Sequence, residues 1–195
     1  MTGSVGHNLD RLEGTRSNNS VSYTTNNMGG FTGNLFYGFG EQAGRTSAGQ
    51  AFGIGGKYDN GPLGLGINYF QSKQGATPAD TSLLIGTTNA GDVNNSGNSA
   101  AKVLNVAASY QFGPARVYAN YNRVKQDLNT ASPTALPSKT LGSANKADIY
   151  EVGTAYSLTP KLKLLGAGTH TRADFNSSSK GKLTQISLGL SLIHI

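Results

Sequence analysis

The sequence of 195 residues contains no cysteine and no tryptophan, and only 13% of its residues are charged. Without cysteine, a disulfide scaffold, a zinc ribbon and a thiol catalyst are excluded. No stretch approaches the ~18 consecutive apolar residues that a membrane-spanning helix requires. The mean hydropathy of −0.32 likewise excludes a protein built from several transmembrane helices. The low share of charged and helix-forming residues argues against a helical bundle.

Glycine is what the chain has in excess, with 27 residues, about twice the usual share of ~7%. Asparagine, serine and threonine are also abundant. Two classes of protein fit this composition. One is a disordered or fibrous chain, and the other is an all-β protein in which apolar residues alternate with small polar ones.

The spacing of the apolar residues favours the all-β class. Phe52 and Ile54, and then Leu65 and Ile67, stand two positions apart with glycines between them. A period of two is typical of a strand with two unlike faces. Most segments run about ten residues, which is the length of a tilted strand that crosses a bilayer. We predict about nine strands, over residues 16–25, 31–41, 50–59, 63–73, 102–112, 115–126, 147–158, 161–172 and 182–192.

The connections between these segments alternate in length. Short turns are expected at 26–30, 60–62, 113–114 and 159–160, and long polar loops at 42–49, 74–101, 127–146 and 173–181. A membrane barrel has this alternation because its short turns gather at the periplasmic rim and its long loops at the external rim. In such a barrel the apolar side chains meet lipid and the polar ones line a wet interior.

Tyrosines recur close to the strand ends, at the same alternate positions as the apolar residues. The Tyr58 hairpin with its Gly61-Pro62 turn is repeated 52 positions later by Tyr110 with Gly113-Pro114. Aromatic rings with a polar tip collect at the boundary between membrane and water. We therefore predict membrane-interface aromatics at Tyr58, Tyr69, Tyr110, Tyr121 and Tyr156.

Residues 15–190 resemble the general porins of Gram-negative outer membranes, in the trimeric form of beta-proteobacteria. Three blocks carry the resemblance. They are Arg16 with Asn19-Ser20-Val21-Ser22-Tyr23 followed by 29–41, Tyr156-Ser157-Leu158-Thr159 with Lys161 and Leu164, and Gln185-Ile186-Ser187-Leu188-Gly189-Leu190 near the end.

The resemblance implies an all-β fold, an antiparallel transmembrane β-barrel of which the chain holds about nine of sixteen strands. An odd number of antiparallel strands does not close on itself, so we expect the C-terminal half of a longer porin. Residues 1–15 are expected to be a loop or the start of the fragment and 16–190 the partial barrel. Residues 190–195 are a candidate non-native tail, and the N-terminus lacks a signal-peptide pattern.

The function that the resemblance implies is passive diffusion of small hydrophilic solutes and inorganic ions across the outer membrane, without enzymatic activity, cofactor or metal. Four charged residues fall at the alternate strand positions that carry polar side chains: Arg16, Lys57, Arg116 and Glu151. We expect them to line the pore and to give it a mild anion preference. Arg16 also falls where the family carries a basic wall residue.

The expected partners are outer-membrane lipid and lipopolysaccharide, and a homotrimer when the chain is full length. Arg123 and Lys125 have the outward parity at the loop end of their strand, where they would meet lipopolysaccharide or water. The cations are dispersed along the chain, so nucleic acid is not an expected partner. The alternative to a porin is a secreted or surface-exposed β-rich adhesin or structural protein.

Overall fold

A computed structural model describes residues 19–40, 50–73, 100–127, 144–175 and 180–192. They form one nine-stranded sheet in which every strand is antiparallel to its neighbour and the strands follow each other in chain order. The strands are β1 (Ser20–Thr24), β2 (Phe31–Gly38), β3 (Ala51–Asn60), β4 (Leu63–Lys73), β5 (Ala100–Phe112), β6 (Ala115–Asp127), β7 (Ala144–Ser157), β8 (Leu162–Phe175) and β9 (Lys180–Leu192).

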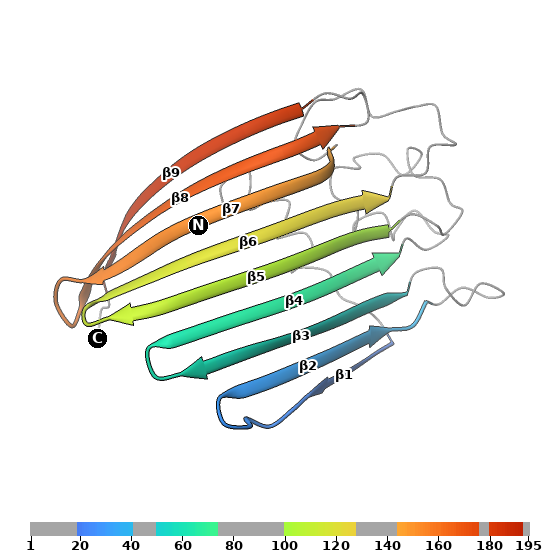
Figure 1. Ribbon diagram of the computed structural model, residues 1–195, viewed down its shortest axis with the longest axis horizontal. Helices are drawn as coiled ribbons and strands as arrows, with labels where there is room; N and C mark the ends of the chain where they lie inside the picture. Colours follow the sequence, from blue (N-terminus) through green and yellow to red (C-terminus); the bar gives the residue numbers. More distant parts are fainter. Residues whose placement is uncertain (1–18, 41–49, 74–99, 128–143, 176–179, 193–195) are drawn as a thin grey trace.

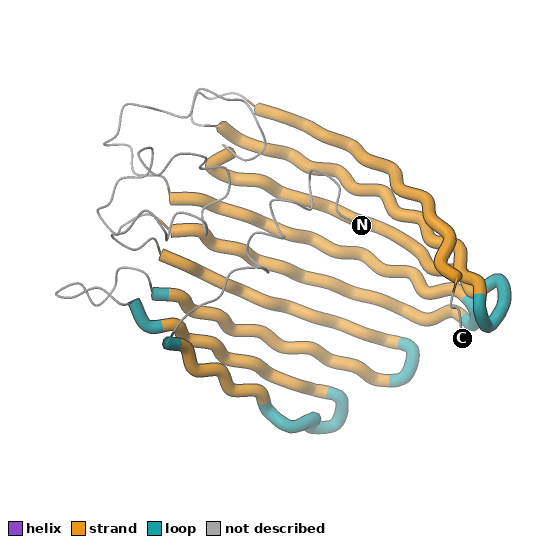
Figure 2. Tube along the Cα trace, turned by 180° about the vertical axis from the view of Figure 1, so that it is seen from behind, coloured by secondary structure: helices purple, strands orange, loops and turns teal. Residues whose placement is uncertain are grey.

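The strands lie side by side in a single curved sheet, from β1 at one edge to β9 at the other (Figure 1). No second layer is packed on either face in the described part of the chain (Figure 2). Within that part, no helix is long and apolar enough to cross a membrane.

The predicted all-β fold and the nine predicted strands are confirmed. The central strands begin and end within a few residues of the predicted bounds, and β4 coincides with the predicted segment 63–73. β7 and β8 extend three residues further at their loop ends than the alternation of apolar residues indicated. The reason is that charged residues replace apolar ones at the alternate positions of these strand ends, so the apolar period of two cannot be recognised there.

The short connections all lie at the same end of the strands, as predicted (Figure 1). We call this the turn end of the sheet and the opposite end the loop end. Two of them are two-residue hairpins, Gly61-Pro62 and Gly113-Pro114, whose glycines have φ of +55° and +52°. Two-residue hairpins of this kind need glycine at the first central position, and proline has no ladder hydrogen bond to lose in a turn. Much of the predicted long loops, the N-terminal 1–15 segment and residues 193–195 lie outside the described residues.

The two faces of the sheet follow from the register, because residues opposite each other in neighbouring strands point to the same side. One series runs Leu65, Ala108, Ala119 and Val152 across β4 to β7, and we call this side the apolar face. The next series runs Gly66, Ala107, Asn120 and Glu151, on the side that we call the polar face.

Apolar residues are not confined to the apolar face. The most buried apolar side chains, Ala51, Val124, Ile149 and Ala173, all belong to the polar face near its loop end. Phe36 and Phe70 join them there, with ring centroids 6.1 Å apart. At its loop end the polar face therefore carries apolar side chains as well as polar ones.

Candidate functional site

The apolar face is widely exposed. Leu65, Ile67, Val106 and Val117 stand 44%, 54%, 40% and 39% exposed, and Ile186 on β9 reaches 79%. They do not meet one another across a dry interior. A continuous apolar surface over this many strands is far larger than the patches that water-soluble monomers show, and it indicates contact with lipid or another protein.

Pairs of aromatic rings border this surface at its turn end. The Phe31 and Tyr58 centroids lie 4.4 Å apart on β2 and β3. Tyr110 and Phe112 repeat the 4.4 Å contact on β5, and Tyr156 follows on β7 with 43% of its surface exposed. Tyr58, Tyr110 and Tyr156 thus lie on the apolar face toward the turn end of their strands, and their role at the membrane interface stays a prediction.

A second border lies toward the loop end. Tyr121 on β6 packs against Tyr150 on β7 with centroids 5.1 Å apart. Tyr69 on β4 donates a hydrogen bond of 3.0 Å to Gln71. Tyr37 and Phe39 form an edge-to-face pair at 4.9 Å. The apolar surface is thus bordered by aromatic rings at both ends, as in a bilayer-spanning barrel.

The border is inclined to the strands. Tyr58 on β3 lies in register with Val152 on β7, yet the turn-end tyrosine of β7 is Tyr156, four residues further on. A shift of four residues, about 13 Å, across four strand spacings of about 4.8 Å corresponds to an inclination of about 35°. Strands of outer-membrane barrels tilt by about 35–45°, so the aromatic border is level in a membrane when the strands are tilted.

The cationic band lies beyond the loop-end border, on the apolar face. It consists of two successive register series in which seven basic residues accompany two acidic ones. The members are Lys102, Lys125, Lys146, Asp174 and Lys180 in one series and Arg123, Asp148, Arg172 and Lys182 in the other. The predicted outward position of Arg123 and Lys125 is consistent with this register.

Asp148 organises the centre of the cationic band. Asp148 has only 9% of its surface exposed. Its carboxylate accepts hydrogen bonds of 2.7 Å from the Tyr121 hydroxyl and 2.7 Å from Arg123 Nε. Lys146 Nζ lies 2.9 Å from its other oxygen. The Arg123 guanidinium also stands 5.8 Å from the Tyr121 ring centroid, so one carboxylate fixes both the cations and the ring that border the apolar surface.

The polar face carries three of the four predicted pore-lining residues. Lys57 of β3 forms an ion pair of 3.2 Å with Asp59, and both side chains are about 60% exposed. Arg116 of β6 donates to the Ser109 hydroxyl at 3.0 Å. Glu151 of β7 accepts a hydrogen bond of 3.2 Å from Thr169. Arg16 lies outside the described residues. These placements agree in parity with the predicted role, which stays a prediction.

Several residues of these surfaces were not predicted from the sequence. Tyr150 and Phe112 complete aromatic pairs whose first members were predicted, and alternation alone contained the signal for both. Asp148 was not singled out, because its partner Tyr121 is 27 residues away in the chain. Asp59 was not predicted as a site residue, although its carboxylate pairs with Lys57 on the polar face. In the part of the chain that the structure describes, no group of three metal-ligating side chains occurs.

Comparison with known proteins agrees with this geometry. A model of the family described as Gram-negative porin matches residues 1–190. OmpT, an outer membrane protein of Vibrio cholerae, aligns with a TM-score of 0.62 at 16% identity, over 88% of this chain and 48% of that protein. OmpF of Salmonella typhi, solved with daunomycin, aligns with a TM-score of 0.61 at 15% identity, over 90% of this chain and 50% of that protein.

At these identities the two solved structures show the fold alone. The chain spans about half the length of each of them. Comparison with curated protein sequences finds no significant match. The nine-stranded antiparallel sheet therefore has the architecture of part of an outer-membrane β-barrel.

We predict that Asp148→Ala destabilises the full-length protein by about 2 kcal/mol, because it leaves two cations and a tyrosine hydroxyl without their common acceptor. Asp59→Ala is the matched control, since the ion pair that it removes is exposed and contributes less than about 1 kcal/mol. Denaturant unfolding of the protein in detergent micelles measures both. Equal losses of unfolding free energy in the two variants would show that Asp148 does not organise the cationic band.

Proposed function

The chain belongs to the Gram-negative porin family, and from that premise we propose that the protein is a passive diffusion channel for small hydrophilic solutes and inorganic ions in the outer membrane. The single observation that carries the proposal is the exposed apolar face with aromatic rings at both ends, opposite a face rich in Gly, Asn, Ser and Thr. Lipid on one side and water on the other is the environment that suits such a sheet. The channel performs no reaction.

The proposal includes a mild preference for anions. On the polar face, Lys57 and Arg116 project toward the proposed lumen together with Glu151 and Asp59. Arg16 adds a third cation on the strength of the family resemblance. Selectivity in a wide pore depends on the charges that line it and is screened by salt. The homotrimer that the resemblance implies is part of the same proposal.

We predict that Arg116→Glu and Lys57→Glu, in the full-length protein in planar bilayers, each lower the chloride-to-potassium permeability ratio severalfold. The reversal potential in a KCl gradient at low ionic strength measures this ratio, because screening is then weakest. Arg16→Glu should act in the same direction and Glu151→Gln in the opposite one.

The matched control is Arg172→Glu, which makes the same charge change on the apolar face. Its reversal potential should equal that of the unmodified channel. Should Arg116→Glu and Arg172→Glu shift the reversal potential alike, or the protein give no conductance at all, the assignment of the two faces would be refuted.

Lipopolysaccharide is the proposed partner of the cationic band. Seven basic residues against two acidic ones stand beside the apolar surface at the loop end of the sheet. The loop end faces the cell exterior in a porin, where lipid phosphates are concentrated. Arg172 lies 6.0 Å from the Tyr150 ring centroid, so its guanidinium is placed at the level of the aromatic border.

We predict that purified lipopolysaccharide raises the unfolding temperature of the full-length protein in detergent, and that the double variant Arg172→Gln, Lys182→Gln reduces this rise by at least half. The reason is that the lipopolysaccharide phosphates lose two charge-assisted contacts in the double variant. Lys163→Gln, on the polar face, is the control and should keep the full rise. An undiminished rise in the double variant would exclude the cationic band as the binding surface.

A further inference from the structure

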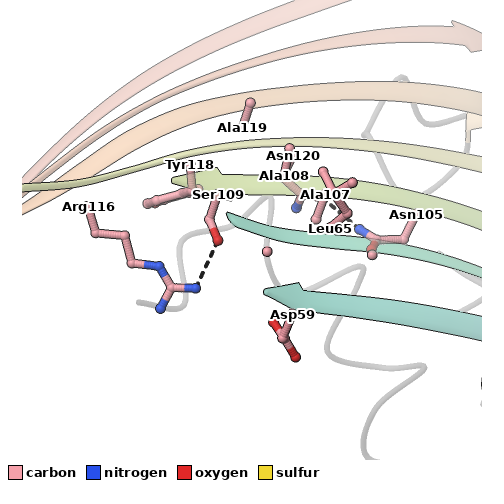
Figure 3. A pocket seen from close by; sticks show the side chains of 12 residues that line it. Asp59, Leu65, Asn105, Ala107, Ala108, Ser109, Arg116, Tyr118, Ala119 and Asn120 are labelled. Carbon is pink, nitrogen blue, oxygen red and sulfur yellow. Dashed lines mark hydrogen bonds between the residues drawn. The ribbon is translucent and has the colours of Figure 1, made fainter. Parts of the chain in front are cut away.

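The polar face is hollowed between β3 and β6. The recess has a volume of about 370 Å³ and is lined by residues of all four strands. Figure 3 shows its charged residues, Asp59 and Arg116, on the same side of the sheet. The volume falls at the lower end of the range of small-molecule sites.

Small residues create the recess. Gly64 and Gly66 of β4 and Ala107 of β5 lie on the polar face, so the centre of this region has almost no side-chain volume. A methyl group placed on Gly66 would meet no atom within 4 Å, which locates open space above that residue. The hollow is therefore a consequence of sequence on two neighbouring strands.

Two opposite charges lean into the recess from its two sides. The Arg116 guanidinium reaches from β6 over β5, where it donates to the Ser109 hydroxyl at 3.0 Å. Asp59 leans from β3 over β4, so that its Oδ1 lies 3.3 Å from the position of a Cβ on Gly64. The two charged tips thus lie above neighbouring strands, whose backbones are about 4.8 Å apart.

Both groups retain capacity for a ligand. A guanidinium has five N–H donors in a planar fork that matches a carboxylate. Among the described residues, the Arg116 side chain is held by its bond to Ser109. The Lys57 ion pair engages Oδ2 of Asp59, which leaves Oδ1 as the oxygen that faces the recess. Asp59 and Arg116 form no ion pair with each other in the described part of the chain.

Amide groups close the recess toward the loop end. Asn105 donates hydrogen bonds from its Nδ2 to Asn120 Oδ1 at 2.7 Å and to Asn122 Oδ1 at 2.6 Å. This fixes the orientation of the amides: Asn105 keeps its carbonyl oxygen as an acceptor, and Asn120 keeps its amide nitrogen as a donor. A polar group that projects from a solute above Gly66 would find both kinds of partner.

We propose that this recess binds a small zwitterionic α-amino acid with a polar side chain. The α-carboxylate pairs with Arg116, the α-ammonium with Asp59, and the side chain lies above Gly66 toward Asn105 and Asn120. An α-amino acid carries both of its charges on one carbon, which suits two opposite charges that lean into one recess over neighbouring strands. The inference rests on the proposed channel function, because it requires the polar face to line a water-filled lumen.

Solute flux through the full-length protein in liposomes tests the proposal, with L-glutamine as the probe and glycerol as the uncharged reference. Glutamine flux is expected to saturate, while glycerol flux rises linearly with concentration. Arg116→Gln and Asp59→Asn each remove a charge-assisted contact and should raise the half-saturating glutamine concentration by about tenfold or more. Glycerol flux should stay unchanged in both variants.

Two further variants separate binding from folding and from general electrostatics. Gly66→Leu fills the hollow and keeps both charges, so it should abolish saturation while single-channel ion conductance shows that the barrel has assembled. Lys163→Gln removes a cation from the polar face outside the recess and should leave glutamine saturation unchanged.

The outcomes distinguish the two claims. If glycerol does not cross, the channel function itself is wrong. If glycerol crosses but glutamine flux is linear, or its saturation is the same in Arg116→Gln, Asp59→Asn and Gly66→Leu as in the unmodified protein, the amino-acid site is refuted and the channel function stands.

Discussion

The structure depends on one constraint: a sheet that faces lipid has no water to satisfy its backbone, so every N–H and C=O must pair within the sheet. The strands from β2 to β8 are paired on both sides by antiparallel ladders and meet this demand. Once the backbone is paired, the side chains on the lipid side must be apolar over the membrane thickness. Strands of 10 to 14 residues, from β3 to β9, supply that length.

The same alternation separates two tasks along each strand. On β6, Val117 and Ala119 belong to the apolar face, while Arg116 and Asn120 belong to the polar face. Residues that are neighbours in the chain therefore meet different solvents. This arrangement lets the polar face carry charges, amides and a recess without weakening the membrane-facing surface. The cationic band shows that the change of solvent also runs along the strands, because charged residues take over the apolar parity at the loop end.

Much of the fold was predictable from the sequence because strand periodicity and hairpin turns are local signals. The period of two in β4 and the Gly-Pro turns at 61–62 and 113–114 required only adjacent residues. The parity of Lys57, Arg116 and Glu151 followed from the same count. These rules did not predict the register of each strand, that is, which residues of neighbouring strands lie opposite each other. The inclination of the aromatic border and the contact between Tyr121 and Asp148 depend on register between strands, which a single sequence does not encode locally.

The polar face shows the other limit of sequence reasoning. Val124 and Ile149 fall at positions that the alternation assigns to the polar face, but both are apolar and buried. Asp59 and Arg116 stand 57 positions apart in the chain, and only the pairing of β3, β4, β5 and β6 brings them to one recess. Composition gave no reason to connect them.

The two faces of the sheet meet different solvents, and the sequence, which has no cysteine, allows this difference to be measured directly. Gly66 and Ile67 are adjacent on β4 but point to opposite faces. Single cysteines at these positions, in the full-length protein reconstituted in lipid vesicles, can be treated with a membrane-impermeant maleimide. We expect rapid labelling of Gly66→Cys and none of Ile67→Cys. Rapid labelling of Ile67→Cys with protection of Gly66→Cys would show that the apolar face meets water and the polar face does not.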